Sequence, residues 1–244
     1  MEEMYQRKAL GMSIKAFAVL MIAVCFIYEM VTPSVKFASL WFSYLVGAVL
    51  YAIGVLMTRI KHDNTRFSVI NEENVSPDLD QAIRETLVAC FPADREYYQR
   101  QSWWHCVPIY RVLGRDRRDS IVAHAAVVER SVAVGCNSSK VHVAGVQSFC
   151  VLPDYRGTGL SDGMMSIAME EVNRRGFDAG LLFCLDELKT VYERMGWHEL
   201  DSDVYMLDEK KGKLLIPAKN ITMFYPLAKR QFPPGDIDLA GTDW

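Results

Sequence analysis

The sequence predicts an α/β (α+β) domain, a mixed and mostly antiparallel sheet with helices on both faces, preceded by an N-terminal hairpin of two transmembrane helices. Two long apolar runs lie within the first 57 residues. Further along, three strand-like runs separated by turns rich in glycine, asparagine and serine follow one another, which is typical of an antiparallel meander. A strand–helix–strand unit then supplies a parallel neighbour to the meander.

The two apolar runs are long enough to cross a membrane twice. Residues 37–57 carry no charge, and a helix of that length spans a hydrocarbon core about 30 Å thick. Residues 12–32 span it as well when Lys15 reaches one interface and Glu29 the other. A cleaved signal peptide is the alternative, but no small-residue cleavage site follows the apolar core. We therefore expect a membrane anchor over residues 1–66, in contact with lipid through residues 12–57, and a separate domain over residues 67–244.

Charge indicates where that domain lies and what it binds. Cations before the first span and after the second outnumber the single Lys36 in the turn, so the positive-inside rule places the 67–244 domain in the cytoplasm. The chain has a formal net charge of −3. Lys and Arg outnumber Asp and Glu in residues 1–66, so the rest of the chain is acidic. The acidic remainder argues against nucleic acid as a partner. The six cysteines are scattered singly, which indicates neither a metal site nor a disulfide framework.

Periodicity predicts the elements of the 67–244 domain in order. A helix is expected over residues 77–90, because Leu79, Ile83 and Leu87 form an apolar stripe at helical spacing. A second is expected over residues 160–175, and Gly176 ends it. The remaining expected elements are a short strand after residue 66, strands at 109–113, 121–134, 141–151 and 179–184, a short helix after residue 186, and closing strands at 204–208 and 221–227.

The most informative stretch is "VLPDYRGTGL", residues 151–160, at a strand-to-helix junction. Amide N–H groups at a helix start lack intrahelical partners, and the helix dipole places partial positive charge there. Gly157 and Gly159 let several of these N–H groups converge and leave no side chain to block a ligand. Arg156 adds a charge. The turn therefore predicts a site for a phosphate or pyrophosphate, although neither a P-loop nor G-x-G-x-x-G is present.

The R-G-x-G of this turn, together with "LLFCLDELKTVYERMGW" further on, resembles the GCN5-related N-acetyltransferase (GNAT) superfamily over roughly residues 67 to 230. The aminoglycoside 2′-N-acetyltransferases and the acyltransferases of lipochitooligosaccharide (nodulation factor) synthesis look most similar. The resemblance implies a GNAT-like fold that transfers an acetyl group from acetyl-CoA to a primary amine, without a metal. The residues that it implies for cofactor binding are Phe149, Val151, Arg156, Gly157, Thr158, Gly159, Leu160 and Ser161.

The resemblance also implies catalytic roles. Tyr192 stands where related enzymes place a phenol that protonates the departing sulfur, and the N–H near Val151 would stabilise charge on the thioester oxygen. Gln147 aligns with the glutamate through which the aminoglycoside enzymes activate the amine, and an amide does not accept a proton. Glu129 is the candidate base in its place. The candidate histidines are His105, His124 and His142.

The last ten residues, "GDIDLAGTDW", resemble the end of the aminoglycoside enzymes, whose final tryptophan faces the substrate amines. The resemblance implies acceptor binding by Asp243 and Trp244, with Asp236 and Asp238 in the same anionic cradle. A solvated acidic tail is the alternative. Two other functions stay open: transfer of a longer acyl chain from acyl-CoA or acyl carrier protein, and a non-catalytic acyl-CoA sensor.

Overall fold

The computed structural model describes residues 65–208, 210–217, 220–227 and 231–244, together with residues 14, 16–20, 22–24 and 44–52. The chain divides into two units, Met1–Asn64 and Thr65–Trp244. The described residues of the first unit are helical, and no described helix in the chain is both long and apolar enough to cross a membrane. Most residues of the two expected spans, 12–32 and 37–57, lie outside the described residues, so the transmembrane hairpin stays a prediction.

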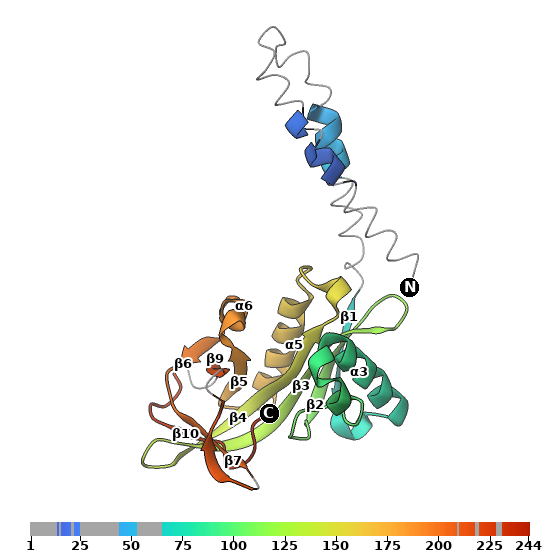
Figure 1. Cartoon of the computed structure of the whole chain (residues 1–244). Helices are drawn as coiled ribbons and strands as arrows, with labels where there is room; N and C mark the ends of the chain where they lie inside the picture. The colour runs from blue at the N-terminus through green and yellow to red at the C-terminus, as the bar shows by residue number, and fades with distance from the viewer. Residues whose placement is uncertain are drawn as a thin grey trace. The chain divides into compact units, whose positions relative to one another are not determined.

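The second unit is a mixed sheet with helices on both of its faces, as the sequence predicts (Figure 1). Its elements in chain order are β1 (Arg66–Asn71), η1 (Glu72–Asn74), α3 (Pro77–Cys90), η2 (Pro92–Asp94), α4 (Arg95–Tyr98), β2 (Tyr110–Arg115), β3 (Ile121–Val134), β4 (Ser139–Val151), η3 (Pro153–Tyr155), α5 (Leu160–Arg174), β5 (Ala179–Leu185), η4 (Asp186–Leu188), α6 (Lys189–Arg194), β6 (His198–Leu200), β7 (Val204–Asp208), β8 (Gly212–Leu215), β9 (Asn220–Pro226) and β10 (Ile237–Asp238).

The strand order of the sheet is β6-β9-β5-β4-β3-β10-β7-β8, and β2 joins β3 with β1 at its outer side. Strands β1 to β4 are antiparallel neighbours, which confirms the meander. β5 runs parallel to β4, which confirms the strand–helix–strand unit. The sequence did not indicate β6, β8 or β10, which have at most four residues each and no alternating apolar pattern of their own.

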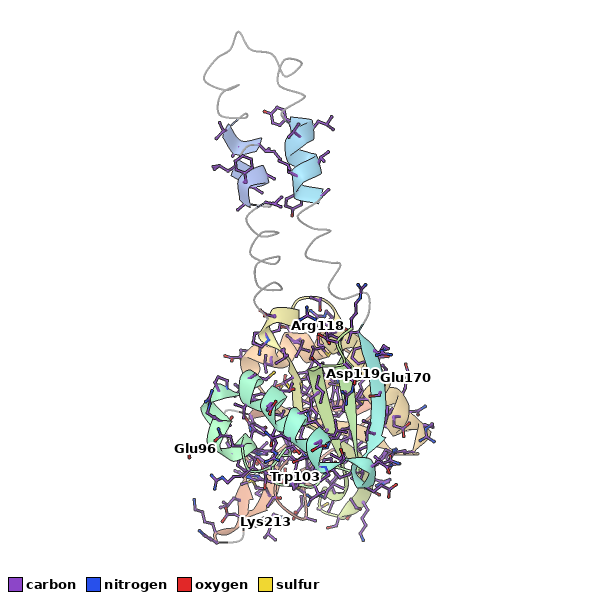
Figure 2. The ribbon with its side chains drawn as sticks, turned by 90° about the vertical axis from the view of Figure 1, so that its right-hand side faces the viewer. Glu96, Trp103, Arg118, Asp119, Glu170 and Lys213 are labelled. Carbon is purple, nitrogen blue, oxygen red and sulfur yellow. The ribbon has the colours of Figure 1, made fainter. Side chains whose placement is uncertain are left out.

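Two helices of predicted extent cover opposite faces of the sheet. Ser76 caps α3 by accepting a hydrogen bond from the Leu79 N–H at 3.2 Å, and the helix buries Ile83 and Leu87. α5 buries Met164, Met165, Ala168 and Val172 against the other face, at the spacing that an amphipathic helix requires. In Figure 2, Glu96 of α4 and Trp103 of the following loop lie on the α3 side, and Glu170 of α5 lies on the other. Side chains of β4 and β5 can therefore meet groups from the α3 side of the sheet or from the α5 side.

Candidate active site

Strands β4 and β5 begin as a pair and then separate. Only Val143–Gly145 pair with Ala179–Leu181, and pairing ends there. Beyond this point β4 stays hydrogen-bonded to β3 along its other edge, and β5 stays hydrogen-bonded to β9. The backbone of residues 146–151 thus has a free edge toward β5, which can bond an extended ligand as another strand would.

A bulge interrupts β4 where the two strands separate. His124 pairs with Cys150 and Ala126 with Gln147, so one residue of β3 faces two of β4. Ser148, in the bulge, has a positive φ of 50°, a conformation uncommon for residues other than glycine. The bulge turns the side chains of Gln147 and Phe149, two positions apart, toward opposite faces of the sheet.

The turn after β4 is open, as predicted. Gly157 and Gly159 have positive φ values of 72° and 82°, and a Cβ on either would meet no heavy atom within 4 Å. Gly159 is the N-cap of α5 and offers no side chain to cap it, so the first N–H groups of the helix have no intrahelical acceptor. The Arg156 Nε donates to the Val151 carbonyl at 3.1 Å, which ties the turn to the end of β4. The main chain here is free to receive an anion.

Three other predicted cofactor residues support the same turn. The Thr158 hydroxyl donates to the Tyr155 carbonyl at 2.6 Å and so closes the turn. Leu160 is buried in the core beneath α5, which leaves its main chain alone for a ligand, and Ser161 is half-buried in the first helical turn.

Tyr192 of α6 stands beside Phe149 of β4. Their ring centroids are 6.0 Å apart, and Trp197 lies 6.4 Å from Tyr192 on another side. Burial, with a smaller contribution from Cys184, raises the pKa of Tyr192 well above its ordinary value. Its hydroxyl makes no hydrogen bond to any residue that the structure describes. A protonated phenol without a partner, next to the free edge of β4, is able to donate a proton to a ligand there.

Both ends of the Gln147 amide bond the loop between α4 and β2. Its Oε1 accepts from the Trp104 N–H, and its Nε2 donates to the Cys106 carbonyl at 2.6 Å. The side chain is 4% exposed. Both ends of the amide therefore hold protein backbone, in a side chain that is almost inaccessible to solvent.

Glu129 lies elsewhere on the sheet. It is opposite Ala144 on β4, five residues before Phe149, which corresponds to roughly 16 Å along a strand. Its carboxylate accepts from His142 Nε2 at 2.7 Å, and the His142 ring stacks on Phe177. The structure thus brings Glu129 and His142 together and brings neither to Tyr192.

His124 is wholly buried on the α3 side of the sheet. Its Nδ1–H donates to the Ser148 carbonyl at 2.9 Å, which supports the bulge, and its Nε2 has no partner among the described residues. Burial is the main cause that lowers the pKa of His124 to about 3, and the charge of Arg111 adds to it. An amine substrate that enters from solvent therefore cannot reach this imidazole.

The C-terminal segment packs on the sheet instead of extending into solvent. Trp244 is 6% exposed and lies over Gly145, where a Cβ would be 2.3 Å from the Trp244 Cε2. Phe183 of β5 contacts the same indole with centroids 5.1 Å apart. Asp243 accepts from His105 Nδ1 at 2.6 Å. The end of the chain therefore lies at the point where β4 and β5 separate, and Figure 1 shows it over β4.

The predicted anionic cradle is only partly assembled. Asp238 pairs with Lys213 at 2.6 Å, and Asp236 lines a separate hollow beside the β3–β4 turn. Asp243 has a partner of its own, His105. Within the described residues there is also no group of three or more His, Cys, Asp or Glu side chains suited to hold a metal ion.

Three elements together are typical of an acyltransferase fold: a sheet that opens between two parallel strands, a glycine turn at a helix start and a half-buried tyrosine beside the opening. A family model described as an acetyltransferase (GNAT) domain matches residues 74–200. The chain belongs to the GNAT acetyltransferases, and it is therefore a GNAT-type N-acyltransferase with acyl-CoA as its co-substrate.

Several solved structures resemble the chain at low identity. The GNAT family N-acetyltransferase YhbS from Escherichia coli, in complex with CoA, is 15% identical over 72% of this chain and 89% of its own, with a TM-score of 0.49. ElaA from E. coli is 15% identical over 66% and 99%, also with a TM-score of 0.49. An acyl-CoA N-acyltransferase from Pseudomonas aeruginosa is 13% identical over 66% and 99%, again at 0.49. No curated protein matches the chain.

Proposed function

We propose that this protein is a membrane-anchored N-acetyltransferase that transfers an acetyl group from acetyl-CoA to a primary amine, with its catalytic domain facing the cytoplasm. The observation that carries the enzymatic part is the open Gly157–Gly159 turn, next to the unpaired edge of β4. Acyl-CoA, when bound, supplies an activated thioester. The main-chain donors at the start of α5 bind its diphosphate, and residues 146–151 pair with its extended arm.

The chain's own groups then manage charge and protons. The N–H near Val151, at the end of the free edge, donates to the carbonyl oxygen of the thioester as negative charge develops on it. The amine nitrogen forms a bond to the acyl carbon and gives up one of its protons to a base, and the carbon–sulfur bond breaks. Tyr192 donates its phenolic proton to the departing sulfur, since burial keeps the phenol protonated. The products are the amide and the free thiol of CoA.

An amino sugar is the acceptor that we propose. Phe183 is half-buried where β4 and β5 separate and packs on the buried Trp244 indole, and the adjacent Asp243 places a carboxylate in the same region. Aromatic rings and a carboxylate suit an acceptor with an apolar face and cationic amino groups. Transfer of longer acyl chains, suggested by a membrane anchor, is the alternative that the donor comparison below distinguishes.

Packing within the N-terminal unit supports the anchor. Ala18 is buried, and a Cβ on Gly47 would lie 2.7 Å from Ile22 Cγ1, so the two helical segments contact each other through small residues. The large apolar side chains point outward; those exposed are Phe17, Val19, Leu20, Val24, Leu45, Val49 and Tyr51. Membrane helices typically place small residues where two helices meet and large apolar residues on the outside.

Calorimetry on the full chain in detergent tests donor use. We expect acetyl-CoA to bind with a measurable heat and CoA to be released when a panel of amino sugars is added. Palmitoyl-CoA serves as the comparison donor, and turnover with it alone would replace acetyl transfer by long-chain transfer. Binding of acetyl-CoA without CoA release from any amine would favour the acyl-CoA sensor.

Cysteine labelling tests the topology. Cys136, in the β3–β4 turn, is an exposed free thiol of the catalytic domain. A membrane-impermeant maleimide should label it in inside-out vesicles and not in intact cells, with Cys136→Ser as the control. Labelling of Cys136 in intact cells would place the domain outside.

A further inference from the structure

His105 and Asp243 form a hydrogen-bonded pair that the sequence places 138 residues apart. Because an ionised carboxylate only accepts, the imidazole Nδ1–H donates to Asp243 Oδ1 at 2.6 Å. This fixes the ring's tautomer and leaves Nε2 with its lone pair. Nε2 has no partner among the residues that the structure describes, and the imidazole is 40% exposed, so a ligand can reach it. The arrangement is that of a base oriented by a carboxylate.

The backbone around His105 is held in an unusual conformation. His105 has a positive φ of 49°, which costs energy for a residue other than glycine and persists only when its surroundings enforce it. Gln147 enforces it from β4, since its amide bonds the peptide groups of both sequence neighbours, Trp104 and Cys106. The Tyr97 hydroxyl, moreover, accepts from the His105 N–H at 3.0 Å. Three side chains thus hold His105: Asp243 bonds its ring, and Gln147 and Tyr97 bond the backbone around it.

This imidazole stands on the face of the sheet opposite Tyr192. Gln147, at the bulge of β4, bonds the backbone next to His105. Trp244, next to Asp243, packs on Gly145 of β4. Both contacts are on the α3 side of the sheet. Tyr192 contacts Phe149 on the α5 side. A thioester held between the separated strands therefore has a tyrosine on one face and an imidazole on the other.

We propose that His105 is the general base of the reaction, with Asp243 and Gln147 as its positioning residues. This inference rests on the proposed acyl transfer to an amine. The His105 Nε2 takes a proton from the amine nitrogen as that nitrogen bonds to the acyl carbon, while Tyr192 gives its proton to the sulfur, so protons balance. The titratable and charged groups around the imidazole are Asp243, Tyr97 and, through the Cys106 thiol, Arg130.

The other candidate bases are placed less well. Glu129 is paired with His142 and lies about 16 Å along the sheet from Phe149. His124 is fully buried and its ring donates to the backbone of the bulge. Only His105, among the described histidines, combines an accessible ring nitrogen with a carboxylate partner at the separation of β4 and β5.

His105→Asn in the full-length protein tests the role, because asparagine tolerates a positive φ and does not act as a base at neutral pH. We expect kcat to fall by about 10²–10⁴-fold while the Kd for acetyl-CoA, measured by calorimetry, stays within about twofold. His142→Asn is the matched control and should retain the parent kcat. Equal kcat in His105→Asn and the parent, or an equal loss in His142→Asn, overturns the proposal.

Chemical rescue separates a base from a structural residue. His105→Gly tolerates the same backbone and leaves space for an imidazole molecule. Added imidazole should restore CoA release in His105→Gly and not in Tyr192→Phe, and absence of rescue contradicts the proposed base.

Asp243→Asn should lower kcat less than His105→Asn does and shift the acid side of the pH–rate profile. Failure of the parent to acetylate any amine would remove the proposed function itself, whereas an active parent with an active His105→Asn removes this inference alone.

Discussion

The Trp244 indole rests directly on the Cα of Gly145, the last residue of β4 that pairs with β5. No side chain fits between them, since a Cβ on Gly145 would approach Trp244 Cε2 to 2.3 Å and Val128 Cγ2 to 2.6 Å. This contact fixes the chain's last residues to the middle of the sheet. It also places Asp243 where it meets His105.

The first prediction concerns this contact. Gly145→Ala should lower the free energy of unfolding by about 1–3 kcal/mol, because the added methyl forces the indole or Val128 to move. In a Trp244→Ala background the same substitution should cost less, since one of the two obstacles is gone. Urea unfolding of the parent, the two single variants and the double variant measures this coupling. Strictly additive effects would show that Trp244 does not occupy this position.

The second prediction separates backbone strain from ligand binding at the glycine turn. Gly157→Ala and Gly159→Ala should each destabilise the fold by about 1–2 kcal/mol through their positive φ. Both should also weaken acetyl-CoA binding, because the methyl group projects toward the ligand. Gly176→Ala is the matched control: its φ is 81°, its Cβ would also meet nothing, and it lies at the other end of α5. Equal loss of acetyl-CoA affinity in all three variants would contradict the placement of the diphosphate.

The third prediction concerns the proposed acid. Tyr192→Phe should lower kcat by about 10²–10⁴-fold and leave the Kd for acetyl-CoA nearly unchanged, since the ring still packs on Phe149 and only the proton donor is lost. Burial raises the pKa of Tyr192, so the parent should keep its activity as pH rises toward 10 until another group titrates. Steady-state kinetics and calorimetry on both proteins check this. An unaltered kcat in Tyr192→Phe would remove the tyrosine from the mechanism.

The fourth prediction is a pH dependence of stability that arises from His124. An exposed imidazole in the unfolded chain has a pKa of about 6.5, whereas burial lowers the pKa of folded His124 to about 3. Between these values the unfolded chain binds a proton that the folded chain refuses. Stability is therefore fully present above about pH 6.5 and falls as pH decreases toward 3, by up to about 1.4 kcal/mol per pH unit.

His124→Asn tests it, because the asparagine amide retains a donor for the Ser148 carbonyl without the titration. Its urea midpoint should fall less steeply than that of the parent between pH 6.5 and 5. Glu171→Gln is the control with a different window: Arg174 and Arg175 lower the pKa of Glu171 to about 2, so its contribution is lost only below about pH 4.5. A parent-like slope in His124→Asn would contradict the assignment.

Local patterns in the sequence determined much of this fold. The stripe Leu79, Ile83 and Leu87 fixed α3, and glycines at 157 and 159 indicated an open turn before α5. The R-G-x-G turn and the later tyrosine were enough for the family, which the family model confirms over residues 74–200. These features depend on residues near one another in the chain, where spacing alone determines which side chains share a face.

The tertiary structure alone decided how distant residues meet. A bulge at Ser148 turned Gln147 away from Phe149, and no periodicity announces such a one-residue shift. Gln147 holds the backbone around His105 and Glu129 pairs with His142, and no local pattern in the sequence indicates either contact. His105 and Asp243 meet only because the sheet carries both the loop after α4 and the end of the chain on one face. The sequence determines each side chain's chemistry, but the packing of segments far apart in the chain decides which of them act together.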